Sequence, residues 1–248
     1  VHLDHAGGAG ALLRELPGAR MLVHPRGARH MIDPSALVQG ALAIYGQARL
    51  EREYGSVIPV PAERVQVSSE GHVLDLAGRA LRFSDTPGHA KHHHCIWDET
   101  SQGWFTGDTF GLCYPELAGV HGVWSLPTTT PVQFEPEALR QSIERMLSFD
   151  PRCMYLTHFG RVEQPELIAA QQLRLLDEVV RLGLSLRHAP ERTTQLERGL
   201  AHLYCESLRQ VGASLARETI LQLLAPDISL NASGMAVWLE RLPSNLAV

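Results

Sequence analysis

Histidine is the residue type in this chain that first suggests chemistry. The sequence contains 13 histidines, and 11 of them lie at or before His158. Imidazole is the commonest protein ligand for metals and the usual acid–base group near neutral pH. Histidines that are merely solvated are also common. The residues around each histidine therefore have to show whether it binds a metal or transfers protons rather than lying in solvent.

Four short motifs place these histidines next to carboxylates and small residues. In one-letter code they are HLDHAGG at the start of the chain, TPGH, FTGDT and LTHFG. Each ends a strand or opens a turn, where small residues would let a ligand approach the backbone. The mixture of imidazoles and carboxylates suits a pair of zinc, iron or manganese ions rather than magnesium or calcium, which prefer oxygen ligands. The candidate ligands are His2, Asp4, His5, His89, Asp108 and His158.

The elements that must position these motifs alternate along residues 1–164. Short apolar runs at 21–23, 80–83, 94–97 and 153–156 predict buried strands. Amphipathic stretches at 9–16 and 137–149 predict helices. Alternating strands and helices indicate an α/β layered domain over 1–164.

Residues 165–248 have a different pattern, with apolar residues at helical spacing throughout. We expect helices at about 167–180, 194–211, 215–224 and 234–242, separated by breakers such as Pro190 and Pro226. The sequence therefore predicts a second, all-helical C-terminal region over 165–248. Its apolar stripes suit either a cover for the active-site mouth or the interface of a homodimer.

Composition limits the classes of partner. Lys and Arg total 22 against 27 Asp and Glu, a formal charge of −5, and no basic stripe marks a nucleic-acid surface. We see no apolar run near the ~20 residues that cross a bilayer. The cysteines are widely spaced, which predicts reduced, buried thiols in a cytoplasmic protein. We expect a small-molecule substrate, with neither nucleic acid nor membrane as a partner. The cysteines are Cys95, Cys113, Cys153 and Cys205.

The four motifs, in this order, resemble the metallo-β-lactamase superfamily. The signature of that family is His-x-His-x-Asp-His, followed by distal His, Asp and His residues. The TPGH and TGDT motifs are most similar to its glyoxalase II-like hydrolase branch. The resemblance covers residues 1–160 and implies an αβ/βα sandwich with the metals at one edge, between two sheets.

The resemblance also implies a ligand set in which Asp108 bridges two metal ions. The first metal would take His2 and His89, and the second would take Asp4, His5 and His158. The first His of the family signature would fall just before Val1, and several strands of the family fold would precede it. We therefore expect that the natural protein has residues before Val1.

Such a centre would perform metal-assisted hydrolysis. Two divalent ions ~3.5–4 Å apart can share a hydroxide and lower the pKa of water towards ~7. The hydroxide would attack an ester, thioester or lactone carbonyl of a small organic substrate. Zinc is the first choice of metal, with iron or manganese as alternatives. Asp4 and Asp108 are the expected catalytic carboxylates: Asp4 would orient the nucleophile or pass a proton to the leaving group.

Other side chains are candidates for contact with substrate. Phe110 and Tyr114 follow the bridging aspartate, as do Trp124 and residues 128–130. They would line the substrate approach or, as the alternative, pack in the core. His30 is expected at the rim of the pocket, in a loop that also holds His24. In the tract 92–94 we expect His93 to form part of the wall or to orient a ligand by hydrogen bonding.

Two other functions fit the same motifs. One is a mononuclear iron dioxygenase resembling the persulfide dioxygenases, which use the positions of His89 and Asp108 together with the first His of the signature. The other is a non-catalytic binding or regulatory protein that keeps the metal site. A flavin-partnered diiron reductase fits less well, because that branch has Glu at the position of His2.

Overall fold

Two sheets of unequal size organise the chain. The computed structural model describes residues 1–129 and 132–243. The large sheet has the order β3-β4-β5-β6-β7-β8, and its neighbours are antiparallel except for the parallel pair β6 and β7. A small parallel sheet pairs β1 with β2. Their bounds are β1 Met21–Val23, β2 Val65–Val67, β3 Val73–Leu76, β4 Arg79–Asp85, β5 His94–Asp98, β6 Gly103–Phe105, β7 Cys153–Leu156 and β8 Gly160–Glu163.

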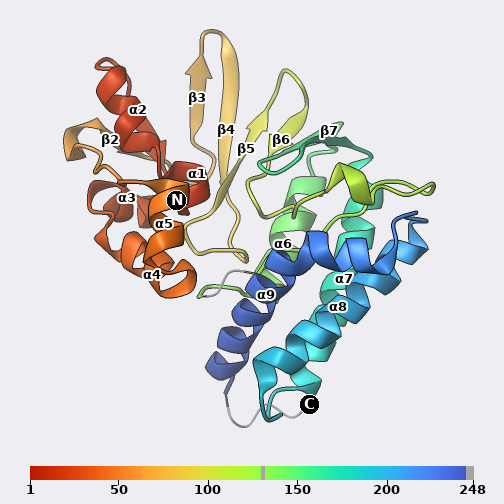
Figure 1. Cartoon of the computed structure of the whole chain (residues 1–248). Coiled ribbons are helices and arrows are strands. Elements are labelled where there is room, and N and C mark those ends of the chain that lie inside the picture. Colours follow the sequence, from red (N-terminus) through yellow and green to blue (C-terminus); the bar gives the residue numbers. More distant parts are fainter. Residues whose placement is uncertain (130–131, 244–248) are drawn as a thin grey trace.

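Helices gather in two groups around these sheets (Figure 1). The N-terminal group lies beside the small sheet, whereas α6 and the C-terminal helices lie on the other side of the large sheet. The packing of α6 is fixed by Trp104 of β6, whose indole N–H donates to the carbonyl of Met146 at 3.0 Å. The helices of these groups are α1 Leu3–Ala6, α2 Ala9–Glu15, α3 Pro25–Ile32, α4 Ser35–Tyr45, α5 Gln47–Tyr54, α6 Pro136–Leu147, α7 Pro165–Ser185, α8 Arg192–Gln210 and α9 Arg217–Arg241.

The predicted α/β class is confirmed, and the four predicted strands coincide with β1, β4, β5 and β7. The loop expected around His24 and His30 is wrong, because helix α3 begins at Pro25. Proline suits the first turn of a helix, where its missing N–H costs nothing. The His24 side chain caps the same turn by accepting a hydrogen bond from the backbone N–H of Arg26 at 3.1 Å.

The C-terminal helices share one core with the large sheet. Trp104 and Met154 of the sheet belong to the same cluster of buried residues as Leu200 of α8 and Leu239 of α9. The two helices expected on either side of Pro226 form the single helix α9. An internal proline costs roughly 3 kcal/mol, and the apolar residues that α9 buries on both sides of it outweigh this cost. The division at residue 164 and the homodimer stay predictions.

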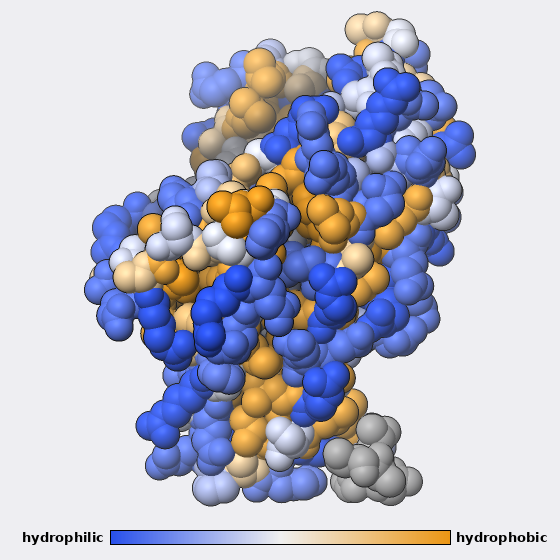
Figure 2. Space-filling model, turned by 90° about the vertical axis from the view of Figure 1, so that its right-hand side faces the viewer, coloured by the Kyte–Doolittle hydropathy of each residue, from blue (hydrophilic) through white to orange (hydrophobic). Residues whose placement is uncertain are grey.

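Helix α9 is also the described helix that is long and apolar enough to cross a membrane by length and composition. Its most apolar window has a mean hydropathy of 1.2, and 44% of that window is buried inside the protein. No apolar run of this length was predicted from the sequence. Figure 2 shows hydrophobic residues interspersed with hydrophilic ones in the lower part of the molecule, where the C-terminal helices lie.

Candidate metal centre

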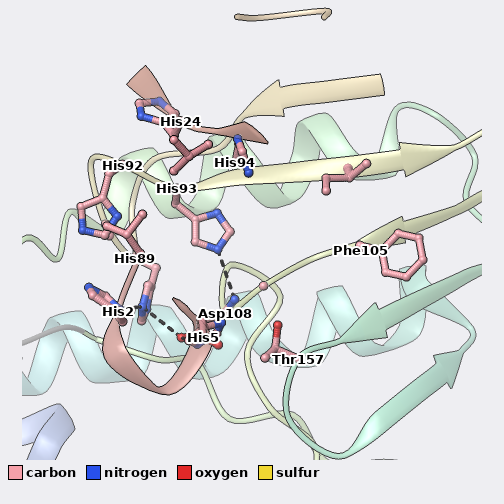
Figure 3. A pocket seen from close by; sticks show the side chains of 15 residues that line it. His2, His5, His24, His89, His92, His93, His94, Phe105, Asp108 and Thr157 are labelled. Atoms are coloured by element: carbon pink, nitrogen blue, oxygen red, sulfur yellow. Dashed lines mark hydrogen bonds and ion pairs between the residues drawn. The ribbon is translucent and has the colours of Figure 1, made fainter. Parts of the chain in front are cut away.

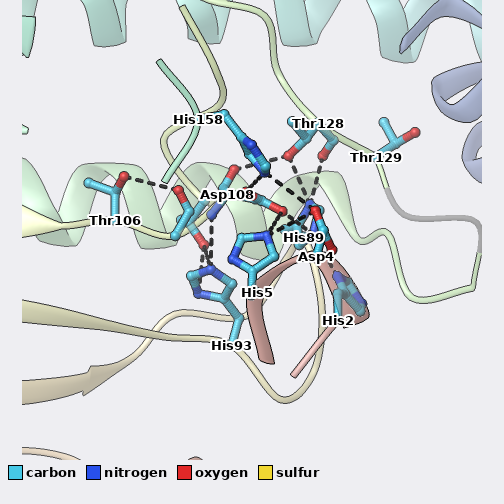
Figure 4. Close-up of polar contacts among 12 residues, drawn as sticks. His2, Asp4, His5, His89, His93, Thr106, Asp108, Thr128, Thr129 and His158 are labelled. Atoms are coloured by element: carbon cyan, nitrogen blue, oxygen red, sulfur yellow. Dashed lines mark hydrogen bonds and ion pairs between the residues drawn. The ribbon is translucent and has the colours of Figure 1, made fainter. Parts of the chain in front are cut away.

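The six predicted ligands lie together, although they come from four separate segments (Figures 3 and 4). His2 precedes α1, and two further ligands lie within that helix. His89 lies between β4 and β5, Asp108 follows β6, and His158 lies between β7 and β8. Because β5, β6 and β7 are neighbours in the large sheet, the connections at their ends meet at one edge.

The side chains form two groups of three with metal-binding geometry. One nitrogen or oxygen atom from each of His2, His89 and Asp108 lies within 4.8 Å of the other two, and the same holds for Asp4, His5 and His158. Asp108 contacts both groups: its Oδ2 lies 3.1 Å from His5 Nε2 and 3.2 Å from His89 Nε2. Its Oδ1 lies 3.5 Å from His158 Nε2. Asp108 is therefore placed between the two groups, as a bridging ligand has to be.

A divalent metal ion fits this arrangement, because Asp108 needs a further partner. The residue is only 7% exposed, and its Oδ1 has no hydrogen-bond donor among the residues that the structure describes. A buried carboxylate oxygen without a hydrogen-bond donor is costly, and its ion pair with His158 is long, at 3.5 Å. Nitrogen and oxygen donors in this mixture suit zinc, iron or manganese.

The charges of these groups are strongly coupled. Burial raises the pKa of Asp108, but hydrogen bonds from His5 and His89 outweigh burial and hold that pKa far below its usual range. Burial also raises the pKa of Asp4, but hydrogen bonds from His158 and His5 outweigh burial and hold that pKa far below its usual range. Burial lowers the pKa of His5, but its bonds to Asp108 and Asp4 raise it to about 10. Without metal, protons on imidazoles therefore balance the two carboxylates.

Zinc binding is expected to release at least about one proton per chain at neutral pH. His5 is protonated below its pKa of about 10, and a coordinated imidazole has to give up that proton. The apparent zinc affinity should therefore rise as the pH rises towards 10, by about tenfold per pH unit for each proton displaced. Calorimetry in buffers with different ionisation enthalpies measures the proton count. Zinc binding without proton release contradicts the expectation, and His5→Gln should reduce the count by about one.

His93 holds the backbone of Asp108 in place by a hydrogen bond. Its Nε2 accepts a hydrogen bond from the backbone N–H of Asp108 at 3.2 Å, so the proton of the neutral ring is on Nδ1. That Nδ1 lies 2.9 Å from the hydroxyl of Thr86 and 3.0 Å from that of Thr109. Burial lowers the pKa of His93 well below its usual value, which keeps the ring neutral. His93 also lines a cavity of about 250 Å³ (Figure 3), so the predicted wall residue also positions a candidate ligand.

Thr128 contacts two of the candidate ligands, whereas the sequence predicted it only along the substrate approach. Its hydroxyl donates to the backbone carbonyl of Asp108 at 2.9 Å and lies 2.8 Å from His89 Nδ1 (Figure 4). Because the single proton of the hydroxyl is used on Asp108, His89 donates from Nδ1, and its Nε2 is directed towards Asp108 Oδ2 at 3.2 Å and His2 Nδ1 at 3.4 Å. Asn231 of α9 fixes this segment by accepting the backbone N–H of Thr129 at 2.9 Å.

Thr128→Val is expected to weaken metal binding by roughly 10–100-fold, the usual effect of removing a hydrogen bond behind a ligand. Valine has the shape of threonine without the hydroxyl, so His89 loses its acceptor. Competition with a chromogenic chelator measures the affinity. Thr129→Val is the control, because the hydroxyl of Thr129 bonds Asn231 rather than a ligand. Equal affinities for the two variants would contradict the role of Thr128.

A larger cavity of about 410 Å³ opens beside the metal centre. Of the residues expected around substrate, His30 and Tyr114 line it, together with Thr128 and Thr129. Thr130 lies outside the described residues. Phe110 is fully buried in the main core, so its ring packs there rather than facing the cavity. Trp124 is also fully buried, and it donates to the hydroxyl of Ser207 at 2.9 Å.

Known proteins share this sequence pattern and this fold. The sequence matches the family model of the metallo-beta-lactamase superfamily over residues 1–158. The chain therefore belongs to the metallo-beta-lactamase superfamily.

Two curated proteins are similar in sequence. The metallo-beta-lactamase fold-containing protein ST1585 of Sulfurisphaera tokodaii is 26% identical over 182 residues, which are 72% of this chain and 64% of that protein. The atrochrysone carboxyl ACP thioesterase of Aspergillus fumigatus is 28% identical over 172 residues, which are 69% of this chain and 40% of the thioesterase. The chain thus spans less than two thirds of the length of both relatives.

Solved structures share the fold. The crystal structure of ST1585 from Sulfolobus tokodaii has a TM-score of 0.60 at 24% identity, covering 85% of this chain and 77% of that one. The metallo-beta-lactamase family protein TTHA1429 from Thermus thermophilus has a TM-score of 0.56 at 18% identity, covering 88% and 71%.

Proposed function

We propose that this protein is a metal-dependent hydrolase that cleaves an ester, thioester or lactone bond in a small organic substrate. The observation that carries the proposal is the position of Asp108, which contacts both groups of candidate ligands at the wall of the larger cavity. A single-metal function would need only one of the two groups. The presence of both favours the two-metal hydrolase over the mononuclear iron dioxygenase.

The roles of the residues follow from their places. His2, His89 and Asp108 would hold one metal ion, and Asp4, His5 and His158 would hold the other with Asp108 between them. When bound, two divalent ions lower the pKa of water towards ~7 and so supply a hydroxide nucleophile. Zinc is our first choice, with iron or manganese as alternatives.

Two side chains of the larger cavity are suited to act on the substrate. Asp4 lines the cavity and its side chain is 43% exposed, and its low pKa keeps the carboxylate ionised, so it can orient the nucleophile by accepting a hydrogen bond. Tyr114 donates to Asp227 at 2.7 Å, and burial together with this bond raises the pKa of the phenol. Its neutral hydroxyl, fixed beside Phe159 at a ring distance of 4.2 Å, is suited to orient the substrate.

The name of one relative supports the reaction class. One of them is named as a thioesterase and is 28% identical to this chain, and thioesters are within the proposed range of substrates. A small-molecule substrate and a cytoplasmic location complete the proposal.

The test is the metal content of the purified full-length protein, followed by assays with ester, thioester and lactone substrates. About two ions per chain, with activity that is lost to a chelator and restored by metal, is the expected result. One iron per chain with oxygen consumption would overturn the proposal in favour of the dioxygenase. Absence of tightly bound metal would favour the binding or regulatory protein.

A further inference from the structure

Part of the wall of the larger cavity is apolar. Helix α4 lines it with Ala36, Leu37 and Ala41, and helix α9 lines it with Leu230. Leu112 adds to the same lining. These side chains can bury an apolar group of the substrate, and a volume of about 410 Å³ is that of a small-molecule site.

Apart from the candidate metal ligands, the charge that the described residues bring to the lining of this cavity is negative. Among the described residues that line it, none is Lys or Arg. The remaining acid is Asp227 of α9, which lines the cavity and accepts the hydroxyl of Tyr114 at 2.7 Å. A substrate carboxylate or phosphate held against this wall would lose its hydration without gaining a cationic partner. It would also be repelled by Asp227.

We propose that the acyl group of the substrate is uncharged and largely apolar, and that acyl groups ending in a carboxylate or phosphate are excluded. This inference rests on the proposed hydrolytic function. The metal centre selects the bond to be cleaved, while α4 and α9 select the acyl group. The C-terminal helical region thus takes part in specificity through Asp227 and Leu230.

The test compares two esters that differ only in the far end of the acyl chain. They are p-nitrophenyl hexanoate and the p-nitrophenyl monoester of adipate, assayed with the metal-loaded full-length protein. We expect kcat/KM to be at least about tenfold higher for the hexanoate, mainly through KM, because an unpaired like charge is costly to place in such a site. Equal values for the two esters, or a preference for the adipate, would overturn the inference.

A variant with an added positive charge sharpens this test. Leu37→Lys places an ammonium group in the apolar wall and is expected to raise kcat/KM for the adipate relative to the hexanoate by about tenfold. Leu37→Met is the matched control, because it changes the shape of the side chain without adding charge. A folded Leu37→Lys protein with an unchanged ratio would also count against the inference.

Failure of the hydrolytic function itself is distinguishable. If neither ester is cleaved by protein that contains metal, the proposed function fails and the cavity can be tested by binding alone. Hexanamide and the monoamide of adipate are then titrated by NMR. Binding of the neutral amide with at least about tenfold higher affinity supports the charge selection, whereas equal or absent binding overturns it.

Discussion

Asp108→Asn is expected to abolish metal-dependent hydrolysis and to lower the metal content from about two ions per chain to one or none. Asparagine keeps the shape of the side chain but removes the negative charge that faces both His5 and His89, at 3.1 and 3.2 Å. A neutral amide is a poor bridge between two cations, so both groups of ligands lose affinity together. We expect kcat/KM to fall on the order of 10³-fold or more, since the nucleophile depends on both metals.

Elemental analysis and an ester assay on the same preparation measure both effects. Asp85→Asn is the control, because Asp85 pairs with His24 at 3.0 Å outside the two groups and its side chain is 49% exposed. A variant that retains two ions and full activity would contradict the bridging role of Asp108. A protein that acts by binding a partner would keep that binding in the folded Asp108→Asn variant, so a pull-down separates the hydrolase from the regulatory protein.

The candidate ligands could be predicted from the sequence because metal binding restricts residue type. Imidazole and carboxylate groups at the ends of strands have few other reasons to recur in four motifs, and the structure brings all six together. Thr128 and Asn231 had no such signal. Their roles depend on contacts across 39 and 102 residues of chain, to His89 and Thr129. Threonine and asparagine have many other uses, so only the fold reveals that they act behind a ligand.

Two of the motif glycines, Gly88 and Gly107, are sites of close approach, but not to the neighbour that we expected. We expected room for a ligand, whereas the structure shows protein atoms. A Cβ on Gly107, whose φ is +49°, would lie 2.3 Å from Nε2 of His93, the ring that supports Asp108. A Cβ on Gly88 would lie 2.2 Å from the backbone nitrogen of Leu139 in α6. A glycine in a motif indicates that another group comes close to the backbone, but it does not indicate whether that group is a ligand or a part of the protein.

Gly88→Ala is the substitution outside the ligands for which we expect the largest loss of stability. Gly88 has a φ of +129°, which strains any residue with a side chain. Its carbonyl accepts the backbone N–H of Glu135 at 2.8 Å, immediately before α6. The added methyl group would meet the backbone of Leu139 rather than a side chain that can turn away. The turn that carries His89 and helix α6 would therefore have to separate.

The structure offers a control that separates backbone strain from this collision. Gly122 has nearly the same φ, +127°, but a Cβ there would meet nothing within 4 Å. Gly122→Ala should therefore cost only the strain, about 1–3 kcal/mol of unfolding free energy. Gly88→Ala should cost roughly 1–3 kcal/mol more for overpacking, and it should also lose metal, because His89 moves with the turn. Urea unfolding of the metal-free variants measures both costs. Equal losses of stability in the two variants would mean that α6 moves away from residue 88 without a cost in free energy. The contact between Gly88 and Leu139 would then not hold His89 in place.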